Sequence, residues 1–154
     1  MRVPSGKAIV ALILGVVLLA FGIQFVPYGH QHDNPPTVQD PHWDSPQTKE
    51  LARRACFDCH SNETVWPWYA RYAPVSWLIA SDVDEARRDL NFSDWRNGDR
   101  KGECAANIRV EITRRSMPPL PYRLMHPEAR LSAAQWQQLI TGLTQTIHLT
   151  DMQH

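Results

Sequence analysis

The sequence predicts an all-helical domain that follows a single apolar N-terminal segment. Three observations support this prediction: an uncharged run at residues 8–26, four later stretches with the apolar spacing of helices, and no sustained polar/apolar alternation of the kind that strands show. The chain has 154 residues, which suffices for one ordinary domain and excludes a multidomain enzyme.

The first element is the run AIVALILGVVLLAFGIQFV, Ala8 to Val26, whose one polar side chain is Gln24. As a helix it would rise about 28 Å, close to the thickness of a hydrocarbon core. Arg2 and Lys7 precede the run and no Lys or Arg directly follows it, which places the N-terminus in the cytoplasm and the remaining chain outside. A cleaved signal peptide is the alternative, although Ala20-Phe21-Gly22 is a poor cleavage site.

The next segment, residues 28–46, holds four prolines among polar residues and predicts an extended linker. The expected organisation is therefore a membrane anchor or signal peptide at 1–27, a linker at 28–46 and a folded domain at 47–154.

The first two helices of the folded domain begin at prolines. Ser45 is a good N-cap with Pro46 at the first helical position, and the apolar stripe of this helix reaches Cys59. Pro74 starts the second helix, which extends to Leu90.

The third helix is expected from about Glu103 to Arg115, where Cys104, Ile108 and Ile112 recur every four residues. This stripe predicts that Cys104 is a small buried apolar residue; a regulatory thiol or an intermolecular disulfide is the alternative.

The fourth helix begins at Ser132, with Gln135 completing a capping box and Leu131 and Trp136 placed to form a hydrophobic staple.

The charge pattern disfavours nucleic-acid binding. The sequence has 16 Lys and Arg residues and 16 Asp and Glu residues, and no cluster of basic residues that would displace phosphate counterions.

The most informative motif is Cys56-Phe57-Asp58-Cys59-His60, which has the C-x-x-C-H spacing that attaches c-type haem. Two thiols three positions apart can both form thioethers along one edge of a porphyrin, and the following histidine can bind the iron. The motif therefore predicts one covalent haem held by Cys56 and Cys59, with His60 as an iron ligand.

Two other interpretations of the paired cysteines are weaker. A thioredoxin-like dithiol occurs in a fold of alternating strands and helices, and the sequence has no strand pattern. A zinc site needs four ligands, and the only further cysteine, Cys104, has no partner beside it.

Met117 is the leading candidate for the second iron ligand. Pro118 and Pro119 follow it and favour an extended loop from which the thioether can reach the iron. Met125, His126 and His148 are the alternatives, and the position could also be open.

Several stretches together resemble a known family. The run CFDCHSNETVWPWYARYAPVSWLIASDVDEARRDLNFSDW, Asn34-Pro35-Pro36 before it and MPPLPYRLMHPEARLS after it are similar to the haem-binding domain family, small bacterial membrane-anchored proteins related to class I cytochromes c. The resemblance implies a class I cytochrome c-like fold around one haem c, with Cys56 and Cys59 holding the haem and His60 and Met117 as its iron ligands.

The resemblance leaves the reaction less defined than the cofactor. We expect a membrane-tethered electron carrier rather than an enzyme, anchored in the bacterial inner membrane by its N-terminal helix with the haem domain in the periplasm, and serving a redox partner protein that the sequence does not identify. A haem sensor or peroxidase-like enzyme with a displaceable sixth ligand is the main alternative, and a structural module is a third. The aromatic residues of the loop after the motif, from Trp66 to Trp77, are expected to line the haem, and packing as ordinary core aromatics is the alternative for each of them.

Overall fold

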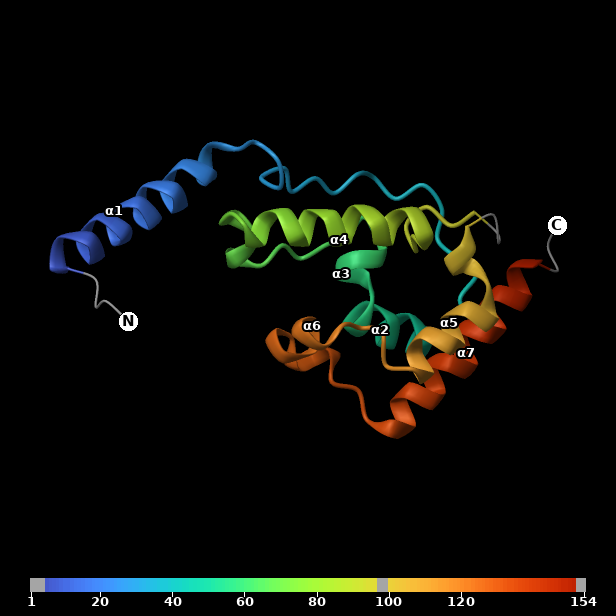
Figure 1. Cartoon of the computed structure of the whole chain (residues 1–154). Coiled ribbons are helices and arrows are strands. Elements are labelled where there is room, and N and C mark those ends of the chain that lie inside the picture. Colours follow the sequence, from blue (N-terminus) through green and yellow to red (C-terminus); the bar gives the residue numbers. More distant parts are fainter. Residues whose placement is uncertain (1–4, 97–99, 152–154) are drawn as a thin grey trace. The chain divides into compact units, whose positions relative to one another are not determined.

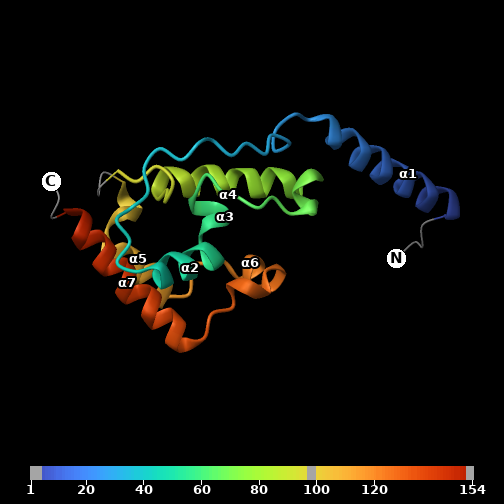
Figure 2. The same cartoon turned by 180° about the vertical axis from the view of Figure 1, so that it is seen from behind.

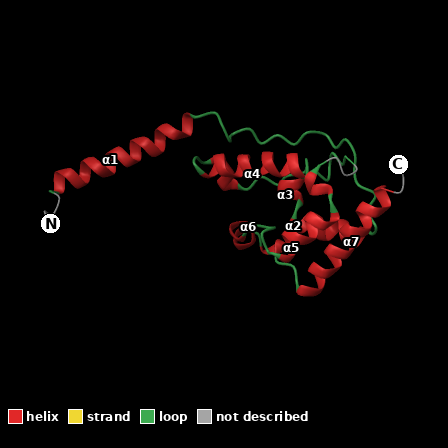
Figure 3. Ribbon diagram, turned by 45° about the vertical axis from the view of Figure 1, so that its right-hand side comes forward, coloured by secondary structure: helices red, strands yellow, loops and turns green. Residues whose placement is uncertain are grey.

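The computed structural model of the chain describes residues 5–96 and 100–151. These residues form α-helices and short 3-10 helices without a strand, so the all-helical prediction is confirmed for them (Figure 3). The α-helices are α1 (Gly6–Gly22), α2 (Pro46–Ala55), α3 (Phe57–His60), α4 (Val75–Asp89), α5 (Ala105–Thr113), α6 (Leu120–Met125) and α7 (Ala133–Asp151). The 3-10 helices are η1 (Ile23–Phe25), η2 (Trp68–Arg71), η3 (Lys101–Glu103) and η4 (Pro127–Ala129).

The chain divides into two compact units. The first consists of Met1–His32 and Trp66–Ser81, and the second of Asp33–Val65 and Asp82–His154.

The first unit contains the apolar helix that the sequence predicts. α1 continues into η1, and the 20-residue segment Gly6–Phe25 is long and apolar enough to cross a membrane, with none of it buried against the protein. A signal sequence near an N-terminus has the same length and composition.

The second unit has its hydrophobic core between α2, α5 and α7, which Figures 1 and 2 show side by side from opposite directions. Three aromatic rings extend this core toward the end of α4. Phe57 stacks on Phe92 with 5.3 Å between ring centroids, and Phe92 stacks on Trp95 at 6.1 Å. The buried core residues are Leu51, Ala52, Ala55, Phe57, Leu90, Phe92, Trp95, Leu131, Leu139, Leu143 and Ile147.

The helix starts that the sequence predicts from capping residues are confirmed. The Ser45 hydroxyl accepts a hydrogen bond from the Thr48 N–H at the start of α2. At α7, the Ser132 hydroxyl accepts from the Gln135 N–H at 3.2 Å, and the Gln135 side chain accepts from the Ser132 N–H at 2.8 Å. This reciprocal pair is the expected capping box.

Two helix predictions are wrong in detail. The first helix does not continue to Cys59: α2 ends at Ala55, Cys56 leaves helical geometry with φ −131°, and α3 begins at Phe57. The third helix begins at Ala105, so Cys104 precedes it and is exposed instead of buried.

The extended segment before α2 is bonded to the second unit over part of its length. The Asn34 side chain donates to the Thr64 carbonyl, and the Asn62 side chain donates to the Pro36 carbonyl. Further along, the Val38 N–H donates to the Ser93 carbonyl at 2.7 Å. Much of the predicted linker is therefore held against the folded domain.

Gly142 sets how closely α7 approaches α2. A Cβ at this position would lie 2.7 Å from Cγ2 and 2.9 Å from Cβ of Thr48, which is buried. We expect Gly142→Ala to lower the free energy of unfolding by about 1–2 kcal/mol, because overpacking outweighs the gain of about 1 kcal/mol in helix propensity. Denaturant unfolding of the purified full-length protein measures this change. The loss should shrink when Gly142→Ala is introduced into a Thr48→Ala chain, and an undiminished loss there would contradict the packing explanation.

Candidate functional site

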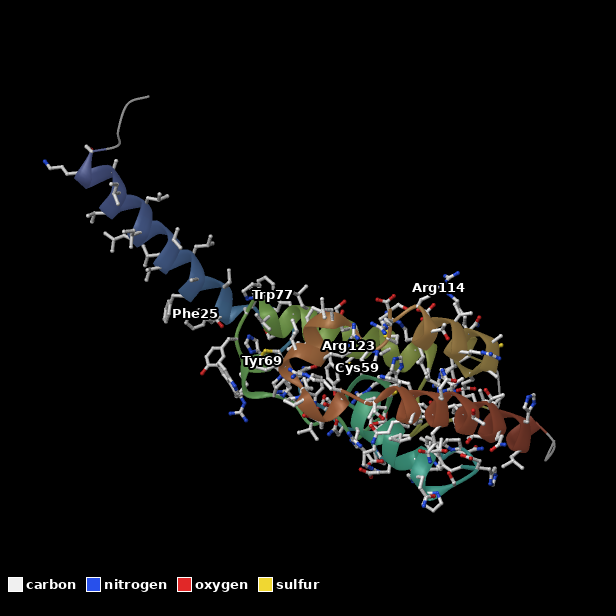
Figure 4. All side chains as sticks on the ribbon, turned by 90° about the horizontal axis from the view of Figure 1, so that it is seen from below. Phe25, Cys59, Tyr69, Trp77, Arg114 and Arg123 are labelled. Carbon is white, nitrogen blue, oxygen red and sulfur yellow. The ribbon has the colours of Figure 1, made fainter. Side chains whose placement is uncertain are left out.

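The C-x-x-C-H motif occupies the junction between α2 and α3. The Cys56 carbonyl accepts hydrogen bonds from the N–H groups of Cys59 at 3.2 Å and of His60 at 2.8 Å. These bonds close a single helical turn that contains both cysteines and the histidine. The backbone therefore presents the three residues as one compact group; Cys59 is labelled in Figure 4.

Both thiols of the motif are free and partly buried. Burial, together with the charge of the neighbouring Cys59, raises the pKa of Cys56 to about 12. Burial and the carboxylates of Asp58 and Asp82 raise the pKa of Cys59 to about 12. A redox-active dithiol needs a lowered thiol pKa, so this environment disfavours the thioredoxin-like interpretation.

The His60 ring is held in one tautomer by the end of α4. Its Nδ1 lies 3.1 Å from the carbonyl oxygens of Ala86 and Leu90. Both partners are acceptors, so Nδ1 carries the hydrogen and Nε2 has a free lone pair. Burial lowers the pKa of His60, partly offset by these two hydrogen bonds, which keeps the ring neutral. A neutral imidazole whose Nδ1–H is bound to a carbonyl is the usual form of a metal-ligating histidine.

A side-chain link joins the motif to α6. The Tyr122 hydroxyl donates a hydrogen bond of 2.8 Å to Asp58 Oδ2, and the Val65 N–H donates to the other oxygen of the same carboxylate at 3.1 Å. Burial, followed by the charge of Asp58, raises the pKa of Tyr122, so its hydroxyl stays protonated. The Tyr122 ring stacks on His126 with 4.1 Å between centroids. No local sequence pattern predicts this link, which spans 64 positions.

Met117 lies in the loop between α5 and α6, as expected, and its side chain is 41 % exposed. Tyr122 is in the helix that follows this loop, so its bond to Asp58 connects the loop to the motif.

The alternative ligands have other surroundings. His126 Nδ1 lies 2.9 Å from a carboxylate oxygen of Glu128. Met125 is exposed at the end of α6, and His148 is exposed on α7.

The aromatic loop that the sequence analysis assigns to the haem lies in the first unit. Trp66 stacks on His32 with 4.6 Å between centroids, whereas Trp68 and Tyr72 are exposed.

Comparison with known families indicates which cofactor the chain binds. The family model of the haem-binding domain matches residues 18–145, most of the chain. This chain belongs to the haem-binding domain family. No curated protein and no solved structure matches it.

The residues of this haem-binding domain fit a haem. The free thiols and the neutral His60 ring supply attachment points and an iron ligand of the right chemistry. On and beside α6, the side chains of Met117, Leu120, Leu124 and Met125 are exposed, so apolar surface is available for a flat hydrophobic ring to cover. Arg123, labelled in Figure 4, has its buried Nε without a hydrogen-bond partner among the described residues, and such a donor suits a propionate.

Proposed function

We propose that this haem-binding domain is a membrane-tethered monohaem c-type cytochrome that transfers single electrons outside the cytoplasm. Cys56 and Cys59 hold the haem by thioethers, and His60 and Met117 are its iron ligands in a class I cytochrome c-like arrangement. The observation that carries the proposal is the position of the His60 ring. His60 lies in a turn that also contains two free thiols, and the carbonyls of Ala86 and Leu90, which are outside this turn, accept hydrogen bonds from its Nδ1–H.

The bound haem supplies an iron that changes charge by one electron. The residues of the chain fix the ligands around it. Hydrogen bonds from Nδ1–H to Ala86 and Leu90 orient His60 and make its free nitrogen a stronger donor. Met117 would supply a soft thioether that favours ferrous iron and would keep peroxide and dioxygen from the metal. A site closed in this way suits a carrier and not an enzyme.

The membrane part of the proposal rests on α1. The 20-residue apolar segment that α1 forms together with η1 carries Lys7 near its start, whereas the flank PYGHQHDN has no Lys or Arg. This asymmetry favours an N-terminus in the cytoplasm and a haem domain on the outer side of a bacterial inner membrane. The redox partner would then be a protein that reaches this membrane surface.

The test is an optical and mass measurement on the full chain, produced together with c-type maturation machinery. We expect one haem per chain that survives denaturation, and low-spin spectra in both oxidation states with slow binding of carbon monoxide. Haem that is fully released by acid and organic solvent would exclude covalent attachment. A high-spin protein that binds carbon monoxide rapidly would instead favour the sensor or peroxidase-like function.

The link between Tyr122 and Asp58 gives a separate prediction about Met117. Tyr122→Phe removes the hydrogen bond to Asp58. The free energy of the contact between α6 and the motif should therefore become less favourable by about 1–2 kcal/mol. The far-red band of methionine-bound ferric haem should therefore disappear at a lower denaturant concentration than in the wild type, before the helical circular dichroism is lost. Tyr28→Phe is the matched control, because Tyr28 is exposed. If the band and the helical signal shift together in Tyr122→Phe, Tyr122 is a general stabilising residue and does not position Met117.

A further inference from the structure

The one polar side chain of the apolar run binds a segment far along the chain. Gln24 Nε2 donates to the Ala73 carbonyl at 3.0 Å and to the Ala20 carbonyl at 2.9 Å, and its Oε1 accepts from the Ala73 N–H at 3.0 Å. Both backbone groups of Ala73 are therefore paired with the side-chain amide of Gln24, which lies in η1. Such pairing satisfies the polar atoms of Gln24 where water is scarce.

Two further contacts in the first unit strengthen this connection. Gly29 has φ +78°, and a Cβ there would lie 2.7–2.9 Å from backbone atoms of Ser76 and Trp77, so only glycine permits the close approach. His32 Nε2 donates to the Ala70 carbonyl at 3.1 Å, and its ring stacks on Trp66. The residues from η2 to the start of α4 are thus held beside the end of the apolar helix.

This held segment exposes large apolar side chains. Trp68 is 73 % exposed, Tyr72 58 % and Leu78 64 %, and Val75 is exposed between them. We call these four residues the aromatic patch. Trp68 and Tyr72 meet edge to face with 6.2 Å between centroids. Phe25, the last residue of η1 and labelled in Figure 4, is also exposed. Tryptophan and tyrosine with an exposed ring are typical of the membrane–water interface.

The charges around the aromatic patch suit anionic lipid. Residues 5–32 and 66–81 contain no Asp or Glu, so no carboxylate in the first unit opposes approach to an acidic surface. Arg71 is exposed in η2, between Trp68 and Tyr72. A basic side chain near the headgroups favours binding to acidic lipids.

We propose that the aromatic patch docks on the headgroup region of the bilayer that α1 crosses, with Arg71 beside lipid phosphates. The bilayer is the partner because Gln24, near the end of the apolar segment, binds Ala73, which follows Tyr72 in the chain, and because the neighbouring Phe25 is also exposed. The inference rests on the proposed membrane tether. It places Trp68 and Tyr72 against lipid, in contrast to the haem contacts that the sequence suggests.

The experiment measures the depth of spin labels in the full haem-loaded chain. The chain carries Cys104→Ser, so that single cysteines can be labelled at Leu78 and Val75 while Trp68 and Tyr72 remain. The protein is placed in vesicles of phosphatidylethanolamine and phosphatidylglycerol, and collision rates with dioxygen and with a water-soluble nickel chelate are compared. Leu18, within α1, marks the membrane interior, and exposed Val38, in the second unit, marks water.

We expect the dioxygen-to-nickel ratio at Leu78 and Val75 to lie between the ratios at Leu18 and Val38. In a Trp68→Ser/Tyr72→Ser chain the ratio should fall to that at Val38, while the Leu18 label stays deep. A Leu78 label as accessible to nickel as Val38 in the parent chain, with Leu18 deep, overturns the docking and leaves the tether standing. A shallow Leu18 label overturns both. If the double serine chain changes the haem spectrum but not the Leu78 ratio, the two rings contact haem and the docking is wrong.

Discussion

A chain in which Cys56 and Cys59 are both replaced with alanine is expected to lose all covalently bound haem. The two cysteines and His60 lie in one helical turn, and both thiols are free, so no other pair in this turn can form the thioethers. Denaturing mass spectrometry should show one haem on each wild-type chain and none on the double variant, and each single variant should keep at most one thioether.

Cys104→Ala is the matched control for this loss. Cys104 is also a free thiol, but it lies before α5 and is exposed. Its replacement should leave one haem per chain. A double Cys56→Ala/Cys59→Ala chain that still carries covalent haem would mean that another residue holds the cofactor, and the proposed attachment would be wrong.

Met117→Ala is expected to produce the largest change in redox properties. Axial ligands set haem potentials over a range of about 0.8 V, and loss of a thioether in favour of water should lower the potential by on the order of 0.1 V. The variant should also lose the far-red methionine band, become partly high-spin and react faster with peroxide. Potentiometric titration and a peroxidase assay measure these changes.

Two variants test the assignment of Met117 against its neighbours. Met125 is exposed at the end of α6, and His126 lies beside Glu128, so alanine at either position should leave the band in place. If Met125→Ala or His126→Ala removes the band and Met117→Ala does not, the assigned ligand is wrong.

Local signals predicted the helix starts well. The Ser132 and Gln135 pair and the Ser45 cap depend on residues within three positions of one another, so the sequence contains the whole interaction. The prediction for Cys104 failed because a four-residue spacing does not show where a helix begins. Cys104 continues the stripe of Ile108 and Ile112 but lies one residue before α5.

Helix α6 was not predicted because Leu120–Met125 follows two prolines and contains a third. Pro121 is nevertheless in the first turn, where a proline fits a helix without losing a backbone hydrogen bond. That position was the signal that could have revealed the helix.

The sequence predicted the site residues that are adjacent in the chain. It did not predict the interactions that only the tertiary fold creates. C-x-x-C-H is a local pattern. The partners of His60 are backbone carbonyls, which leave no trace in residue identity, and the bond between Asp58 and Tyr122 joins residues that only the tertiary fold brings together.

Under the proposed membrane tether, the bonds of the extended segment before α2 would limit the distance between the folded domain and the membrane. A free spacer of 19 residues at 28–46 would reach about 65 Å. No such free spacer exists, because His32 is bonded to Ala70 and Asn34 to Thr64, so the chain on either side of Asp33 is held by other parts of the protein. Under the proposed tether, electron transfer would take place close to the lipid, and the proposed redox partner would have to reach the membrane surface.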